Sequence, residues 1–425
     1  MIQKLLSFLL INLFITGAYA RTDATLLSTK TASAGGSSSR TNTVNSGAII
    51  ENGDVWVWGY RDGGISGNQY FLLEWDKPER VSYFVSQGKK IIQIAGGVQH
   101  FIALDMNGDV WGWGHNGYNQ ADGGQCGSKA TTNSPCQVLQ GKDVIQIHAG
   151  EYVSYALTKN GEVYTWGHSS HGEVGNGTLK ATNNVYQIPQ NYFNNKKVVL
   201  IGAAYEGGYA INKDGEIFGW GDEQANSFGY DTTPVYQRSV LTPKKLNISI
   251  DGKNITYICG GEGFTEYLTE NGDVYGIGEL SRIGQGVSPS SHERTATPVK
   301  IMSDVQDLYC RYAGSTAVRN NDSTHIYTWG SNGSNDPYFI YGSTPQKRII
   351  NGKLVRLDGG KDNLYYLNDN GEYYGVGYGG GNKFAHHSNT NIDWPGKRID
   401  FLDDAVKEVY GQDYIIGQED INKLK

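Results

Sequence analysis

Acidic and tyrosine residues recur inside a series of short segments rich in glycine and alanine. In AGEYVS (149–154), AAYEGG (203–208) and GGEGFT (260–265) the small residues are shared, while the acids and tyrosines among them vary. Aromatic side chains mixed with charge often anchor protein interfaces, and carboxylates attract a basic partner. Two carboxyl groups held close together could instead act as general acid and general base. Either chemistry requires a fold that brings these distant segments together.

A motif of eight residues is copied along the chain at intervals of about fifty residues, a period typical of propellers and solenoids. NGDVWVWG, NGDVWGWG and NGEVYTWG are its first three copies. Asn-Gly favours a tight hairpin turn, the bulky residues that follow favour a strand, and the closing Gly allows a sharp bend. The copies occupy residues 52–59, 107–114, 160–167, 214–221, 271–278, 323–330 and 370–377.

A second shared pattern precedes the hairpin motif, as in IIQIAGGVQHFIALDMNG (91–108) and VIQIHAGEYVSYALTKNG (144–161). It predicts an apolar strand, a glycine-rich turn and a second apolar strand. A fourth extended segment follows the long loop after each Trp-Gly, as in PCQVL (135–139). Four strands in each of seven repeats predict an all-β fold, a seven-bladed β-propeller of four-stranded antiparallel blades.

The repeats resemble those of the regulator-of-chromosome-condensation family, whose members form seven-bladed β-propellers. AGGVQHFIAL (95–104), NGDVWGWGHNGYNQ (107–120) and their copies carry the resemblance, which extends over residues 45–420. The family's namesake is a nuclear exchange factor for a small GTPase, but no exchange-factor residue is matched here by motif. The family also includes a secreted bacterial propeller that inhibits β-lactamases through an aromatic and acidic rim. The resemblance thus implies a class, a secreted protein-binding propeller.

In a propeller, the glycine-rich turns between first and second strands crowd one rim around the mouth of the central channel. The residues at which the repeats differ there are the candidate binding residues, unless the acids only keep a solvated rim soluble. We predict an exported, non-enzymatic scaffold that binds another protein through this rim. The predicted rim residues are Glu151, Tyr152, Tyr205, Glu206, Glu262, Tyr312, Asp362, Asp413 and Tyr414.

Two other functions stay open. A propeller hydrolase or lyase could use the channel-mouth acids Glu151, Glu206 and Glu262, and a glycan-binding adhesin could use exposed tyrosine and tryptophan. The chain has no GxSxG elbow, no HExxH motif and no phosphate-binding loop, so no catalytic residue is assigned. His115 and His168 occupy matching WGH positions. Their spacing does not indicate convergence, so no metal and no cofactor are predicted.

The first twenty residues, MIQKLLSFLLINLFITGAYA, predict a secretory signal peptide. Residues 21–44 are expected to be a flexible lead-in and residues 421–425 a short tail. No later segment is long and apolar enough to predict a membrane span. The formal net charge of −7, without a basic block, disfavours nucleic acid as a partner. Because of the predicted signal peptide we expect a secreted or periplasmic protein. We also expect it to be a monomer.

Four cysteines in an exported chain are expected to pair. Cys126 and Cys136 lie in one loop, QADGGQCGSKATTNSPCQVL, and are predicted to form a local disulfide. Cys259 and Cys310 lie one repeat apart in corresponding segments. They either form a second disulfide or are small buried residues.

The ring could close in two ways. VKEVYGQDYIIGQED (406–420) repeats the upstream pattern without a following Trp-Gly strand, while SGAIIENGDVWVWG (46–59) has an incomplete upstream half. We predict that residues 406–420 complete the first blade. The alternative is that residues 41–51 supply strands for it and the C-terminal segment packs elsewhere.

Overall fold

The computed structural model describes most of the chain between Lys30 and Arg398. The predicted signal peptide and residues 406–425 lie outside the described residues, as do the predicted rim residues Asp362, Asp413 and Tyr414. The described ranges are 30–34, 45–49, 53–59, 66–68, 78–127, 130–224, 227–229, 237–248, 250, 252–330, 343–359, 363–370, 372–377 and 392–398.

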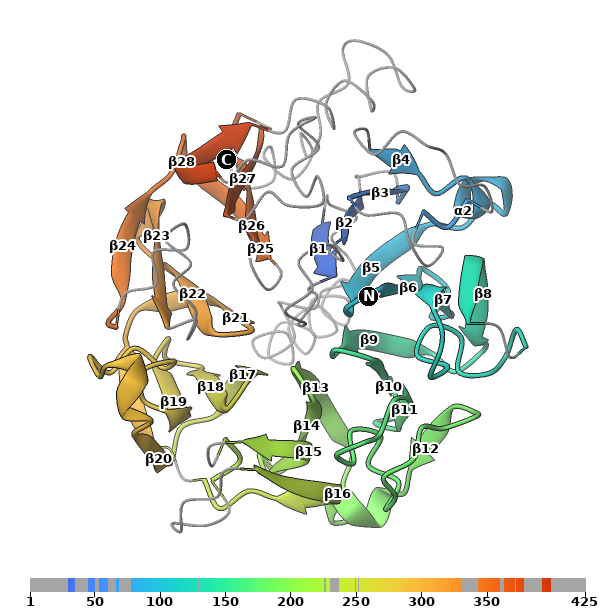
Figure 1. The fold of residues 1–425 in the computed structure, drawn as a ribbon, viewed down its shortest axis with the longest axis horizontal. Helices are drawn as coiled ribbons and strands as arrows, with labels where there is room; N and C mark the ends of the chain where they lie inside the picture. Colours follow the sequence, from blue (N-terminus) through green and yellow to red (C-terminus); the bar gives the residue numbers. More distant parts are fainter. Residues whose placement is uncertain are drawn as a thin grey trace, which may run out of the picture.

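Four-stranded antiparallel sheets stand around a central axis like the blades of a propeller (Figure 1). Six consecutive blades follow the predicted plan, in which four successive strands pair in chain order. The predicted all-β propeller of four-stranded antiparallel blades is therefore confirmed. The strands of these six blades are β5 (Ile91–Gly96), β6 (His100–Asp105), β7 (Val110–His115), β8 (Thr131–Leu139), β9 (Val144–Ala149), β10 (Val153–Thr158), β11 (Val163–Gly167), β12 (Tyr186–Ile188), β13 (Val198–Ala204), β14 (Gly207–Asn212), β15 (Ile217–Gln224), β16 (Gln237–Lys245), β17 (Ile255–Gly261), β18 (Phe264–Thr269), β19 (Val274–Glu279), β20 (Arg294–Met302), β21 (Val305–Arg311), β22 (Gly314–Arg319), β23 (Asp322–Gly330), β24 (Gln346–Ile349), β25 (Leu354–Gly359), β26 (Asn363–Asn368), β27 (Tyr373–Gly377) and β28 (Ile392–Arg398).

The first sheet is built differently, so the predicted count of seven equivalent blades is corrected to six. Its outermost strand has only two residues, because the chain turns there into a short helix. Its inner strands come from a part of the sequence that lacks the glycine-rich upstream pattern of the other repeats. The elements of this region are β1 (Lys30–Ala34), β2 (Asn45–Ile49), β3 (Val55–Gly59), β4 (Glu79–Arg80) and α2 (Ser82–Ser86).

The first sheet lies between the first and last of the six blades. Its strand β1 contacts both β5 and β25, and Figure 1 shows the sheet between these blades. β1 pairs with β2 and belongs to the segment expected to be a lead-in. The innermost strand of this sheet thus comes from the N-terminal side of the chain. The segment predicted to complete the sheet, residues 406–420, lies outside the described residues.

The tryptophans of the hairpin motif form the packing between blades. Trp113, Trp166, Trp220 and Trp329 have no exposed surface. Within its own blade, the Trp113 ring stacks on another aromatic ring. The Trp220 ring instead meets Tyr155 of the preceding blade edge to face, with centroids 6.0 Å apart. Because each aromatic buries a large apolar area, the blades stabilise one another.

Two short 3-10 turns, η1 (Gln190–Phe193) and η2 (Pro289–Ser291), lie in loops.

The glycines of the motif have the backbone conformation that their positions require. In the second copy, Gly108 in the hairpin turn has φ of 78° and Gly114 at the end of the motif has φ of 106°. A Cβ atom on Gly114 would lie 2.6 Å from the carbonyl oxygen of Gln99. Only glycine combines this positive φ with so close an approach. The predicted turn and closing bend are thus both present.

Both cysteine pairs form disulfides. Cys126 and Cys136 are joined as predicted, with Cα atoms 6.3 Å apart. Cys259 and Cys310 are also joined, with Cα atoms 5.6 Å apart, which resolves the question that the sequence left open. Because they lie on β17 and β21, the second bond links the inner strands of two neighbouring blades.

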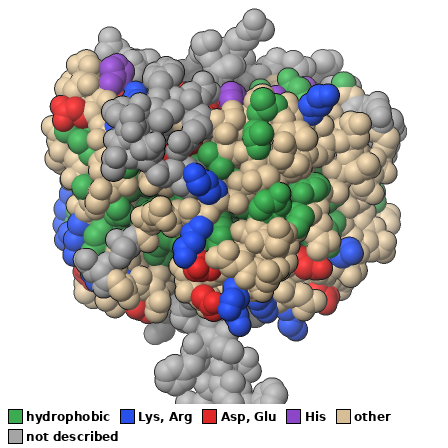
Figure 2. All heavy atoms as spheres, turned by 90° about the horizontal axis from the view of Figure 1, so that it is seen from below, with side chains coloured by type: hydrophobic (Ala, Val, Ile, Leu, Met, Phe, Trp, Pro, Cys, Tyr) green, Lys and Arg blue, Asp and Glu red, His purple; other side chains and the backbone are tan. Residues whose placement is uncertain are grey.

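The surface of the disc carries charges of both signs. Seen edge-on, Lys and Arg side chains are interspersed with Asp and Glu side chains (Figure 2). Among the described helices, none has the length and apolar character needed to cross a bilayer.

Candidate binding rim at the channel mouth

The glycine-rich turns between first and second strands are joined to one another by backbone hydrogen bonds. The amide of Val98 donates to the carbonyl of Glu151, and the amide of Glu151 donates to the carbonyl of Tyr205, both at 2.8 Å. The amide of Glu262 donates in the same way to the carbonyl of Tyr312 at 2.8 Å. Each turn is therefore positioned by its neighbour. The six described residues of the predicted rim do come together around the channel.

A cavity of about 170 Å³ opens at the centre of these turns. Its wall consists of glycines and alanines from the ends of the inner strands, which leave the space open because they have small or no side chains. Glu151, Tyr205 and Tyr312 also line it, together with Arg311 of β21. We call the six residues Glu151, Tyr152, Tyr205, Glu206, Glu262 and Tyr312 the channel-mouth rim.

Two tyrosines of the channel-mouth rim meet over this cavity. The rings of Tyr205 and Tyr312 have centroids 4.9 Å apart and an interplanar angle of 80°. Burial, and then the neighbouring carboxylate of Glu151, raise the pKa of the Tyr205 hydroxyl well above its usual range. Burial and a hydrogen bond to Glu262 raise the pKa of Tyr312 likewise. Both hydroxyl groups therefore stay protonated and act as hydrogen-bond donors at neutral pH.

Arg282 pairs with one of the predicted acids. Its Nη1 lies 2.7 Å from Glu262 Oε2, and its Nε lies 2.9 Å from Glu279 Oε2. The guanidinium carbon also lies 5.9 Å from the centre of the Tyr312 ring. Arg282 follows β19 in a loop without a repeated pattern, so the sequence did not indicate its role. Arg282 is thus shared between Glu262 and Glu279, and it offsets part of the negative charge on this side of the rim.

Glu206 lies where carboxyl groups crowd together. Burial, followed by the charges of Glu151 and Asp222, raises the pKa of Glu206 to about 9. Its Oε2 lies 4.0 Å from Nδ1 of His171. The crowding therefore favours the protonated, neutral form of Glu206. The sequence placed Glu206 on the rim but did not predict that His171 and Asp222 would lie beside it.

Tyr152 belongs to a cluster of rings beside the cavity. The Tyr118 ring lies 5.6 Å from that of Tyr152 and 4.4 Å from that of His168, measured between centroids. The ring of His115 also lies beside that of Tyr152, with centroids 6.4 Å apart. Burial, and then the charge of Glu151, raise the pKa of the Tyr152 hydroxyl to about 12. The two histidines of the WGH motifs thus contact a tyrosine ring.

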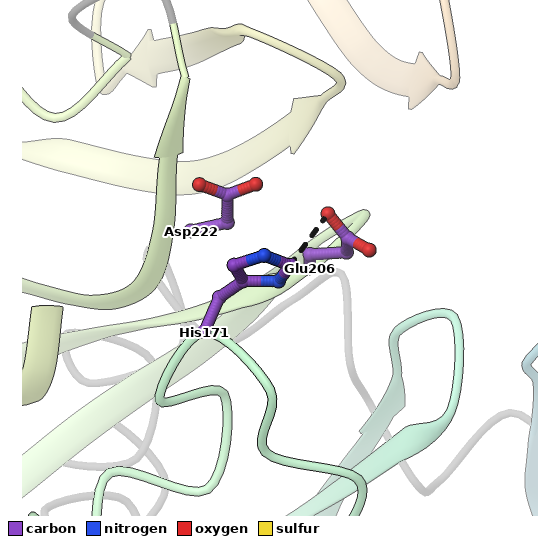
Figure 3. Close-up of side chains that lie close together, drawn as sticks. All are labelled: His171, Glu206 and Asp222. Atoms are coloured by element: carbon purple, nitrogen blue, oxygen red, sulfur yellow. Dashed lines mark ion pairs between the residues drawn. The ribbon is translucent and has the colours of Figure 1, made fainter. Parts of the chain in front are cut away.

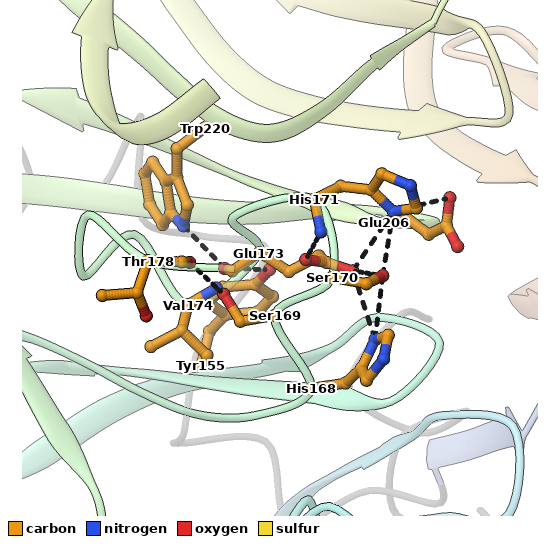
Figure 4. Close-up of polar contacts among 10 residues, drawn as sticks. All are labelled: Tyr155, His168, Ser169, Ser170, His171, Glu173, Val174, Thr178, Glu206 and Trp220. Atoms are coloured by element: carbon orange, nitrogen blue, oxygen red, sulfur yellow. Dashed lines mark hydrogen bonds and ion pairs between the residues drawn. The ribbon is translucent and has the colours of Figure 1, made fainter. Parts of the chain in front are cut away.

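Glu173 organises the loop that follows β11 (Figure 4). Its backbone carbonyl accepts hydrogen bonds from Tyr155 Oη at 3.0 Å and Trp220 Nε1 at 2.9 Å. Its side chain accepts from the amide of His171 at 2.7 Å and lies 3.3 Å from His168 Nδ1. Burial tends to raise the pKa of Glu173, but His168 and the backbone donors outweigh burial and lower it. The loop is therefore held rigidly against the next blade.

Comparison with known proteins identifies the repeats. Residues 91–120 and 144–173 match the family model of the regulator of chromosome condensation (RCC1) repeat. The chain is 27% identical over 237 residues to human E3 ubiquitin-protein ligase HERC2, an alignment that covers 54% of this chain and 5% of HERC2. It is 26% identical over 299 residues to Arabidopsis thaliana RCC1 domain-containing protein RUG3, covering 68% of this chain and 63% of that protein. The chain thus spans less than two thirds of these relatives.

Two solved structures share the fold. Prp20p of Saccharomyces cerevisiae is similar with a TM-score of 0.67 at 20% identity, covering 81% of this chain and 85% of that one. Human WBSCR16 is similar with a TM-score of 0.64 at 21% identity, covering 79% of this chain and 85% of that one. The resemblance predicted from the repeated motifs is therefore confirmed: residues 91–120 and 144–173 match the RCC1 repeat, and the chain has the fold of an RCC1-like β-propeller.

Proposed function

We propose that this chain is an exported, non-enzymatic propeller that binds another protein through the channel-mouth rim, as a monomer. The observation that carries the proposal is the series of turn-to-turn hydrogen bonds, because it gathers tyrosines and acids from several blades around one cavity. Such a rigid, aromatic surface loses little conformational entropy on binding. Asp362, Asp413 and Tyr414 occupy corresponding turns in the sequence and would extend the same surface.

The charges of the rim favour a partner with a basic side chain. Glu262 is paired with Arg282, so the acids around Glu206, namely Glu151 and Asp222, are the ones that would attract such a partner. A Lys or Arg of the partner would approach these acids beside the faces of Tyr152 and Tyr205, where cation–π attraction adds to charge attraction. Because this attraction is screened by salt, binding should weaken as ionic strength rises.

Two further observations support export and protein binding. Both disulfides suit an oxidising compartment, which fits the signal-like first twenty residues and a secreted or periplasmic location. Structures of yeast Prp20 are described with Kap60 bound and with binding to Gsp1p and histones. These partners belong to Prp20, and the likeness supports only the idea that this fold can serve as a binding scaffold.

Affinity capture with three baits tests the proposal. The first bait is the unchanged protein, and the second carries Glu151→Lys and Tyr205→Ala on the rim. The matched control carries Asp214→Lys and Glu270→Ala, which lie in hairpin turns between second and third strands, at the opposite end of the strands. Circular dichroism and thermal melting establish that all three fold.

We expect a protein that is retained by the unchanged bait and the control but lost from the rim variant. Retention by all three baits would indicate that the partner binds the long loops after each Trp-Gly and not the rim. Capture of no protein by the unchanged bait would contradict the proposed function.

One observation favours a second function. Glu206, whose pKa is raised, lies beside Glu151, and a pair of neighbouring carboxyl groups can act as general acid and general base. A hydrolase or lyase built on them would lose activity in both Glu151→Gln and Glu206→Gln. Glycan and ester substrates incubated with the unchanged protein test this function, and partner capture without turnover would favour the scaffold.

A further inference from the structure

Three metal-ligating side chains converge where two blades meet. His171, Glu206 and Asp222 each offer one ligand atom, and these atoms all lie within 4.8 Å of one another. His171 lies in the loop after β11, Glu206 in the turn between β13 and β14, and Asp222 on β15. Figure 3 shows the side chains of His171, Glu206 and Asp222 gathered close together. An ion held here would join the β9–β12 blade to the β13–β16 blade.

The separations suit a small ion after minor movement. The ligand atoms of His171, Glu206 and Asp222 lie within 4.8 Å of one another. In a tetrahedral site with metal–ligand bonds of about 2.0–2.2 Å, neighbouring ligand atoms lie about 3.3–3.6 Å apart. The side chains of His171 and Glu206 keep 28% and 20% of their surface exposed, so rotation about their side-chain bonds can close the difference.

The histidine is oriented by a second set of contacts. Ser170 Oγ lies 3.0 Å from Nδ1 of His171, and Glu173 Oε1 lies 3.7 Å from the same nitrogen. Glu173 is itself 2% exposed and accepts a hydrogen bond from the His171 amide, so it cannot easily move. Metal-binding histidines usually have one ring nitrogen fixed by a carboxylate or hydroxyl group while the other binds the ion. By the same rule Nδ1 is the fixed nitrogen, and Nε2 would be the ligand atom.

We propose that His171, Glu206 and Asp222 bind one divalent transition-metal ion, with zinc as the best match, and that the ion fastens the two blades together. One imidazole with two carboxylates is a ligand set that zinc accepts, with a water molecule in the fourth position. Calcium needs six to eight oxygen ligands and is therefore disfavoured. This proposal does not depend on the proposed protein-binding function.

Isothermal titration with ZnCl2 tests the site, using the purified protein after treatment with EDTA and dialysis. Three single variants are compared, namely His171→Ala, Asp222→Asn and the control His292→Ala. The control removes a histidine that is 73% exposed and lies 3.9 Å from a carboxylate oxygen of Glu279. MnCl2 and CaCl2 are titrated as competitors. Cobalt(II) gives a second readout, because a tetrahedral site with a histidine ligand produces an absorption band in the visible region.

We expect one zinc ion per chain, a higher melting temperature with zinc, and at least tenfold weaker binding in His171→Ala and Asp222→Asn. The control should bind zinc like the unchanged protein, and calcium should not compete. The proposal is overturned by the absence of stoichiometric zinc binding, or by binding that both site variants retain. If a variant fails to fold, the cobalt spectrum of the unchanged protein decides, because an octahedral or absent band contradicts the site. No partner protein enters this assay, so its outcome is separate from that of affinity capture.

Discussion

The rings of Tyr205 and Tyr312 meet edge to face at the channel mouth, with centroids 4.9 Å apart, although their blades are not neighbours. Tyr205 follows β13 and Tyr312 follows β21, and the β17–β20 blade stands between the two. The contact therefore reaches over the cavity instead of along the ring of blades. It makes the rim a continuous surface and gives the first of four predictions.

Removing the two tyrosines should have non-additive effects on stability. Edge-to-face aromatic pairs contribute about 0.5–1.5 kcal/mol beyond the area that they bury. The free energy of unfolding of Tyr205→Ala, Tyr312→Ala and the double variant, measured in urea, should show a coupling of this size. The control is Tyr118, whose ring packs on Tyr152 and His168, and the pair Tyr118→Ala and Tyr312→Ala should be additive within about 0.5 kcal/mol. Additivity in both pairs would contradict the contact.

Replacing Arg282 should destabilise the protein strongly. Its side chain is 15% exposed and is paired with Glu262 and Glu279. Removal of one partner from a largely buried ion pair leaves unpaired charge and costs about 3–5 kcal/mol. Arg282→Ala should therefore lower the free energy of unfolding, measured in urea, by about 3 kcal/mol. Lys245→Ala breaks an ion pair whose lysine is 51% exposed, and it should lose less than about 1 kcal/mol. Equal losses would contradict the role given to Arg282.

Stability should fall as pH rises because of Glu266. Burial raises the pKa of this carboxyl to about 8, against hydrogen bonds from Trp329 and Ser315. Between about pH 4.3, the pKa of an unfolded glutamate, and about pH 8, the folded protein keeps the proton of Glu266 while the unfolded chain loses it. The free energy of unfolding is therefore highest at low pH and decreases as pH rises through this range. The loss should approach about 1.4 kcal/mol per pH unit.

Glu266→Gln isolates this effect, because glutamine keeps the shape and can accept a hydrogen bond from Trp329 Nε1. Buried His148, whose pKa is lowered to about 4, is the same in both proteins and cancels in the difference. Urea unfolding is measured from pH 5 to pH 8. As pH rises, the free energy of unfolding of the glutamine variant should increase relative to that of the unchanged protein. Parallel pH profiles would mean that Glu266 does not titrate in this range.

The two disulfides should differ in their contributions to stability. Cys259 and Cys310 are separated by 51 residues, whereas Cys126 and Cys136 are separated by 10. Loop-closure entropy predicts about 4 kcal/mol for the longer loop and about 3 kcal/mol for the shorter one. Replacing each pair by alanine and measuring unfolding in urea tests this order. A larger loss for the shorter loop would show that strain or residual structure outweighs loop length.

The local parts of the fold could be predicted because their causes are local. Gly108 and Gly114 have the positive φ values that their places in the motif require, and Trp113 is buried where the alternation predicts. The first sheet could not be predicted in the same way. Its inner strand β1 belongs to a serine- and glycine-rich stretch without an apolar alternation, and its pairing with β2 depends on the neighbouring blades.

By itself, the sequence determined the repeat, the four-stranded blade, the pairing of Cys126 with Cys136, and the turns that carry Glu151, Tyr205 and Tyr312. Each follows from a short pattern whose backbone preferences act within a few residues. Only the tertiary structure decided that Arg282 pairs with Glu262 and that His171 lies beside Glu206 and Asp222. These neighbours come from long, non-repeating loops, and their positions depend on how one blade packs against the next.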